Sequence, residues 1–169
     1  PGQVWTFCPN STKVASDMED PLLPYFSGRV EQIEVGGTRN FTYTVRDATS
    51  GDWLVIDPHD GPELLPALED AASGEGHLRA ILLTHSHWDH CDGIGAVVGM
   101  ARRSPDFEVL CHALELHRLK GKYALPAGIR QRSIRDGETL EWKGAPDLTV
   151  FALHLPGHSA GGCAFLTTF

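Results

Sequence analysis

One short run, His-Ser-His-Trp-Asp-His at residues 85–90, limits what this chain can fold into more than any other feature. The run follows directly on residues 79–84, an apolar segment whose length and composition are typical of a buried β-strand. His85 and His87 are two residues apart, so at the strand period of two both can point in the same direction. The run therefore predicts a strand end, followed by a turn, that gathers several metal-binding side chains.

The side chains of this run suit a metal centre with two positions. Imidazole nitrogens and carboxylate oxygens bind zinc, and they also bind iron and manganese. His85 and His87 are expected at one position. The turn after the strand aims Asp89 and His90 at a second position, where two ions about 3.5–4 Å apart can share a water molecule and lower its pKa. The alternative is a polar turn that holds histidines by chance, and four ligand-type residues within six positions argue against it.

A second turn with a histidine lies towards the C-terminal end, in the sequence Pro-Gly-His-Ser at residues 156–159. Proline fixes φ and glycine permits unusual backbone angles, so such a turn can fix the direction of one side chain. Taken alone, His158 would more often be a surface residue. Beside the run at residues 85–90, it becomes a candidate third ligand for the first metal.

The rest of the chain predicts one mixed domain. Residues 1–27 show no steady period and are interpreted as an irregular N-terminal arm, while residues 28–169 form the domain. Strands are expected at residues 29–35, 41–45, 53–56, 79–84, 107–110, 148–153 and 164–169. Helices are expected at residues 62–72, after Asp92 as an acidic N-cap, and at 112–119. Helices that follow buried strands predict an α/β fold with mixed sheets covered by helices.

Composition excludes several kinds of partner. Fourteen basic and 22 acidic residues give a formal charge of −8, which argues against a broad nucleic-acid surface. No apolar run approaches the roughly 20 residues that a membrane helix needs. The four cysteines are scattered and form no CxxC pair, so reduced thiols and a cytoplasmic location are expected. Since the chain begins at Pro1, a removed organelle-targeting segment stays open as an alternative.

Together these motifs resemble the metallo-β-lactamase superfamily. Residues 85–90 look like its HxHxDH signature, and residues 156–159 look like its PGH[ST] turn. Asp57, in the sequence Val-Ile-Asp-Pro, looks like the aspartate that ends an early strand in this family. The resemblance implies a four-layer α/β/β/α sandwich with the metals at one edge of the paired sheets. It assigns His85, His87 and His158 to the first metal, Asp89 and His90 to the second, and Asp57 to a position that orients the ligands.

Within the superfamily, the sequence looks most like glyoxalase II (hydroxyacylglutathione hydrolase). Asn40-Phe41, residues 56–58, residues 80–85 and residues 135–138 stand in the expected order. The resemblance implies hydrolysis of a thioester or similar acyl bond in a small molecule, with a glutathione conjugate as one candidate. Two zinc ions are implied for a complete site, with iron or manganese as alternatives, and Asp89 is expected to help deprotonate the attacking water.

Other functions of the same fold stay open. A persulfide dioxygenase branch that uses one iron shares the early motifs, and a lactonase is a third possibility. Members of the family also carry a bridging aspartate and a further histidine after the PGH turn, but only eleven residues follow His158 here. The expectation is therefore the N-terminal portion of the fold with an incomplete second site, and an inactive fragment or pseudoenzyme is the remaining alternative.

Several other polar residues invite a functional interpretation, and a structural one is favoured for each. His154 stands four residues before His158, where a strand would place both on one face, but a non-ligand role is expected. Cys91 is interpreted as a small residue at a helix start in preference to a thiolate ligand, and His59 as a loop histidine. His112 and His117 are expected on a solvated helix. Three arginines could face an anionic substrate, but a solvated strand face is favoured for them: Arg130, Arg132 and Arg135.

Overall fold

The computed structural model describes residues 28–37, 40–101, 104, 106–119, 125 and 127–167. The expected arm at residues 1–27 lies outside this part of the chain. The first described strand starts at Gly28. No helix in the described part is long and apolar enough to cross a membrane.

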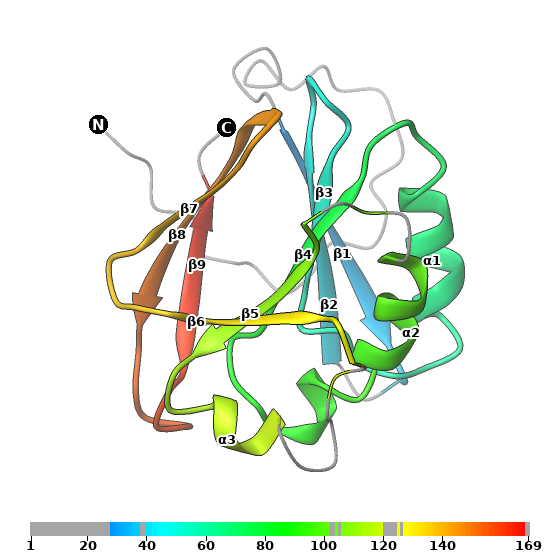
Figure 1. Ribbon diagram of the computed structural model, residues 1–169. Helices are drawn as coiled ribbons and strands as arrows, with labels where there is room; N and C mark the ends of the chain where they lie inside the picture. The colour runs from blue at the N-terminus through cyan, green and yellow to red at the C-terminus, as the bar shows by residue number, and fades with distance from the viewer. Residues whose placement is uncertain are drawn as a thin grey trace, which may run out of the picture.

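The larger sheet has six strands that stand side by side in chain order. They are β1 (Gly28–Val35), β2 (Asn40–Asp47), β3 (Trp53–Ile56), β4 (Leu78–Leu82), β5 (Glu108–His112) and β6 (Arg130–Ile134). The pairs from β1 to β3 are antiparallel and those from β3 to β6 are parallel. The helices α1 (Leu64–Ala71) and α2 (Ile94–Met100) connect parallel strands and cover one face of this sheet (Figure 1).

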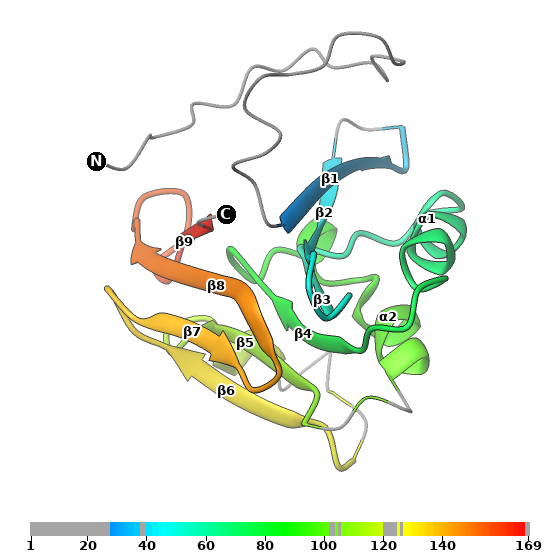
Figure 2. The same cartoon turned by 90° about the horizontal axis from the view of Figure 1, so that it is seen from above.

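The smaller sheet consists of three antiparallel strands, β7 (Thr139–Trp142), β8 (Ala145–His154) and β9 (Cys163–Thr167). It lies on the face of the larger sheet opposite α1 and α2 (Figures 1 and 2). The described elements thus form a helix layer, a six-stranded layer and a three-stranded layer. This is the arrangement of the expected α/β/β/α sandwich over the part of the fold that the chain contains.

Two apolar cores explain why β3 and β4 read as near-continuous apolar runs. Successive side chains of a strand point to opposite faces, so a strand that is covered on both faces needs apolar residues throughout. Val55 and Ile81 pack into the core beneath α1 and α2. Leu54 and Leu82 pack into the core between the two sheets. All four are fully buried, and the two cores fix the edge from which the histidine run leaves β4.

Some local predictions were wrong. The helix expected at residues 112–119 is shorter, because His112 still belongs to β5 and α3 covers only Leu116–Leu119. The strand β7 was not predicted. Asp92 does not cap α2, whose N-cap is Gly93 and has no side-chain cap bond. The carboxylate of Asp92 instead accepts hydrogen bonds from His59 Nδ1 at 3.0 Å and from the Asp60 N–H at 2.8 Å.

Candidate metal centre

The candidate ligands gather at one edge of the sandwich because of how the strands run. β3 and β4 are parallel, so their carboxyl ends lie at the same edge. Asp57 follows β3, and the histidine run (residues 85–90) follows β4. The loop between β8 and β9 (residues 155–162, the His158 loop) reaches the same edge. A hydrogen bond of 2.8 Å from the Cys163 N–H to the Thr84 carbonyl ties the start of β9 to the end of β4.

Three imidazoles converge in what we call the three-histidine group: His85, His87 and His158. One ring nitrogen of each lies within 4.8 Å of one nitrogen of each of the others. His85 Nε2 and His87 Nδ1 are 3.1 Å apart, close to the roughly 3.4 Å that separates two nitrogens around a tetrahedral zinc ion. The donor set and its spacing therefore fit a zinc-sized ion. His85 is buried and His158 is exposed, so one side of the group is open to a further ligand.

The surroundings of His85 favour a neutral ring. The Thr84 hydroxyl donates to Asp57 Oδ2 at 2.5 Å, so its oxygen accepts from His85 Nδ1, which is 3.0 Å away. The proton of the neutral ring then sits on Nδ1, and Nε2 keeps its lone pair. Burial, with a contribution from the charge of His90, lowers the pKa of His85 to about 4. The ring is therefore neutral at pH 7, as a ligand must be.

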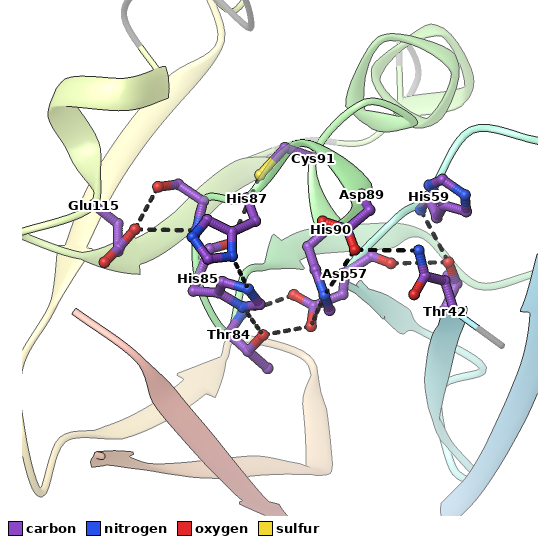
Figure 3. A network of polar contacts seen from close by, with 12 residues as sticks. Thr42, Asp57, His59, Thr84, His85, His87, Asp89, His90, Cys91 and Glu115 are labelled. Atoms are coloured by element: carbon purple, nitrogen blue, oxygen red, sulfur yellow. Dashed lines mark hydrogen bonds and ion pairs between the residues drawn. The ribbon is translucent and has the colours of Figure 1, made fainter. Parts of the chain in front are cut away.

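A second set of donors, which we call the aspartate group, combines Asp57, His85 and His90. Asp57 Oδ1 accepts the Thr84 N–H at 2.7 Å, and Asp57 Oδ2 accepts His90 Nδ1–H at 2.9 Å (Figure 3). Burial lowers the pKa of His90, but the hydrogen bond and the charge of Asp57 outweigh it and raise this pKa. The backbone of Asp57 has a φ of +50°, a strained conformation that directs its carboxylate at these partners.

Asp89 lies beside this second group, and neither of the two groups contains it. Its Oδ2 atom is 3.8 Å from His90 Nε2 and accepts a hydrogen bond of 3.3 Å from the Asn40 amide. Asn40 is the first residue of β2, so the larger sheet holds this carboxylate in place. The metal-binding and catalytic roles of Asp89 stay predictions.

Glu115 is a residue of this region that the sequence analysis missed. Its carboxylate accepts hydrogen bonds from the N–H and the hydroxyl of Ser86 and from the N–H of Gly161. Burial raises its pKa, but the bonds from Ser86 and Gly161 outweigh this effect and hold the pKa at about 2. In Figure 3, Glu115 lies on one side of His85 and His87, and Asp57 lies on the other. The only local signal in the sequence is an acidic residue between two leucines.

Three structural interpretations agree with the observed contacts. Cys91 is fully buried, its thiol faces the His85 carbonyl at 3.6 Å, and burial raises the pKa of this thiol far above its ordinary value. His154 donates from Nε2 to the Ala160 carbonyl at 2.9 Å and belongs to neither donor group. His59 lies in the loop after β3, although it is buried there.

The structure corrects the prediction for His112 and adds detail to the prediction for two arginines. His112 is not on a solvated helix, because it ends β5 and its ring stacks on that of His154 with centroids 4.1 Å apart. Arg130 and Arg132 lie on β6 and both pair with Glu108, so these charges are partly neutralised within the fold.

Comparisons with known proteins place the chain in a family. The profile of a beta-lactamase superfamily domain matches residues 52–164. Hydroxyacylglutathione hydrolase of Cereibacter sphaeroides is 35% identical over 127 residues, which cover 75% of this chain and 42% of that protein. The solved B3 metallo-beta-lactamase BLEG-1 has a TM-score of 0.61 at 22% identity, covering 82% of this chain and 67% of that one. TTHA1623, solved in a di-iron-bound form, has a TM-score of 0.54 at 31% identity, covering 81% and 66%.

The chain belongs to the metallo-β-lactamase superfamily. The profile match covers most of the domain, and it includes β3, the residue Asp57 that follows it, and the loop that carries His158. The chain spans about two-fifths of the length of the hydroxyacylglutathione hydrolases that it matches.

Proposed function

We propose that this chain provides the metal-binding part of a hydrolase that cleaves a thioester or similar acyl bond in a small molecule, with a glutathione conjugate as the first candidate. The observation that carries the proposal is the three-histidine group, with its zinc-like spacing and its one open side. The similarity to several hydroxyacylglutathione hydrolases supports the choice of substrate class.

In this proposal His85, His87 and His158 hold the first ion, and Asp89 and His90 contribute to a second. A bound divalent ion supplies a Lewis acid that polarises the acyl carbonyl and lowers the pKa of a coordinated water. Asp57 accepts a hydrogen bond from His90 Nδ1–H, and the other ring nitrogen, Nε2, lies 3.8 Å from Asp89 Oδ2. His158 is exposed, so an acyl group can approach the centre from its side.

Asp89 is the proposed proton acceptor for the attacking water. Its Oδ2 atom accepts a hydrogen bond from the Asn40 amide, and Oδ1 has no hydrogen bond to the described residues. The side chain is 28% exposed, so solvent can reach it. A carboxylate that is fixed through one oxygen can orient a water through the other and take its proton.

Zinc is the proposed metal, with iron and manganese as alternatives. Imidazole and carboxylate ligands suit all three ions, so ligand type alone does not select one. The di-iron form of a 31% identical structure makes iron the strongest alternative.

Metal analysis and a hydrolysis assay on the full-length protein test the proposal. Zinc should co-purify with the protein, and S-lactoylglutathione should be hydrolysed, with activity lost on chelation and restored by added zinc. His158→Ala should abolish the activity, while His77→Ala, a change at an exposed histidine that precedes β4, at the end of the strand opposite the histidine run, should preserve it. Zinc-loaded protein that cleaves neither this thioester nor other acyl substrates would contradict the proposal. Iron with persulfide oxidation in place of hydrolysis would contradict it as well.

A further inference from the structure

The three-histidine group depends on two segments that are far apart in the sequence. His85 and His87 come from the histidine run after β4, whereas His158 comes from the loop between β8 and β9. These strands belong to different sheets. A ligand set that is split in this way binds tightly only when the protein fixes the spacing of its two halves before the ion arrives.

Glu115 touches both halves with one carboxylate. Its Oε2 atom accepts the N–H of Ser86 at 3.1 Å and also the Ser86 hydroxyl, and Ser86 stands between the two histidines of the run. Its Oε1 atom accepts the N–H of Gly161 at 2.7 Å, three residues after His158. Each carboxylate oxygen therefore binds one of the two segments. The fixed separation of the two oxygens sets the distance between the histidine run and the His158 loop.

The rest of the contact is equally constrained. A Cβ atom at Gly161 would lie 2.7 Å from Glu115 Cγ and 3.0 Å from His112 Nδ1, so only glycine lets the His158 loop approach this closely. Glu115 itself is held by a hydrogen bond of 2.9 Å from its N–H to the His112 carbonyl, at the end of β5. The carboxylate is thus anchored to the larger sheet, independently of both segments that it joins.

A buried carboxylate is expensive unless it is paired. Glu115 is 2% exposed, and none of the ion pairs found among the described residues includes it. Its charge is balanced there by hydrogen-bond donors from the two ligand-bearing segments. An apolar residue would fill this space at lower cost, but it could not hold those donors.

We propose that Glu115 is a positioning residue of the metal centre, which holds the histidine run and the His158 loop at the spacing that lets three histidines bind one ion. The inference rests on the proposed metal binding but not on the proposed substrate. The pKa of about 2 keeps Glu115 ionised at any working pH, as its acceptor role requires.

The test compares metal affinity in single and double variants of the full-length protein. Glu115→Gln keeps the shape but replaces one acceptor oxygen by an NH₂ group, so one of the two segments loses its bond. Its affinity for Co²⁺, measured by chelator competition, should fall about 10- to 100-fold, and the visible Co²⁺ spectrum should change. Glu141→Gln, the same change at an exposed residue of β7, should leave both unchanged.

The double variant separates positioning from general stabilisation. If Glu115 acts by placing His158, then Glu115→Gln should weaken binding less than about two-fold in a His158→Ala background, since the effects of coupled residues do not add. Equal losses in both backgrounds, or an unchanged affinity of the single variant, would overturn the inference. Should Glu115→Gln fail to fold, Ser86→Ala removes a single donor and is judged by the same comparison.

Failure of this inference and failure of the proposed function give different results. Wild-type protein that binds no Co²⁺ or Zn²⁺ overturns both. Wild-type protein that binds metal without any dependence on Glu115 overturns only the positioning role. Metal binding that depends on Glu115, in a protein that hydrolyses no thioester, supports the positioning role and overturns the proposed function.

Discussion

The three-histidine group and the aspartate group share His85 but differ in how ready they are for a metal ion. In the three-histidine group, two ring nitrogens already stand 3.1 Å apart, and one side of the group is open. In the aspartate group, Asp57 Oδ2 already accepts the Thr84 hydroxyl and His90 Nδ1–H. An ion bound by Asp57 itself would compete with these bonds, whereas an ion bound by His90 Nε2 and Asp89 would not. We therefore propose that the first group acts as a set of ligands, and that Asp57 in the second group supports His90 by a hydrogen bond.

The two groups also differ in how the protein shifts the pKa values of their histidines. The environment lowers the pKa of His85 to about 4, mainly through burial, so its lone pair is free at neutral pH. At His90 burial also acts to lower the pKa, but the partner Asp57 prevails and raises it. Burial therefore dominates at His85, and the carboxylate of Asp57 dominates at His90.

Removal of the shared histidine should have the largest effect on metal binding. His85→Ala removes one of the three proposed ligands of the first ion, so the affinity for that Zn²⁺ should fall at least about 100-fold, on the order of 3 kcal/mol. Zinc titration against a chromogenic chelator measures this, with His77→Ala as the matched control. A variant that still binds its first ion as tightly as the wild type would break the distinction between the two groups.

Changes at Asp57 should act mainly on folding and on the second position. Asp57→Ala leaves Thr84 and His90 without their buried acceptor, and the free energy of unfolding should fall by about 3–5 kcal/mol. Asp57→Asn keeps a side chain that tolerates a φ of +50°, so its loss should be smaller. Urea unfolding in the presence of a chelator measures the free energy of unfolding of both variants. Equal losses for the two variants would contradict this, because they would show that the shape of the side chain and its tolerance of a positive φ do not matter.

Glu115 should make stability depend on pH in a defined window. Its pKa is lowered from 4.5 to about 2 in the folded protein, so its contribution is fully present above pH 4.5 and is lost as the pH falls towards 2. The difference in unfolding free energy between wild type and Glu115→Gln should therefore be constant near neutrality and shrink across this window. Urea unfolding at a series of pH values checks the trend. A difference that does not vary with pH would contradict it.

Cys91 should give the smallest effect, although it directly follows the histidine run. Its thiol is fully buried and faces the His85 carbonyl, and Cys91 belongs to neither donor group, so we expect no ligand role for it. Cys91→Ser should lower the free energy of unfolding by about 1–2 kcal/mol and change zinc affinity less than about two-fold. Chelator competition measures the affinity. A hundred-fold loss would place the sulfur among the ligands.

Much of the fold and the first site could be predicted because their signals are local. The apolar runs at residues 53–56 and 79–84 report strands that are buried on both faces, and the histidine run reports the strand end. His158 could be paired with that run only through its Pro-Gly turn and the family resemblance. The structure brings its ring to 4.8 Å from that of His85, measured between centroids.

The failures share a physical cause, which is competition from partners far away in the sequence. Asp92 carries a typical capping side chain, but His59 and the Asp60 N–H, from the loop after β3, take its carboxylate. The proposed role of Glu115 depends on hydrogen bonds from Ser86 and Gly161, which lie 29 and 46 residues away and reach it only in the folded protein. No local period or propensity reports such contacts.

The most direct test of the central claim is a zinc titration of the full-length wild type beside His158→Ala and His90→Ala. The three-histidine group predicts a tight first equivalent in the wild type that survives His90→Ala and is lost with His158→Ala. A first equivalent that survives His158→Ala and is lost with His90→Ala would contradict the account, because the ion would then sit in the aspartate group.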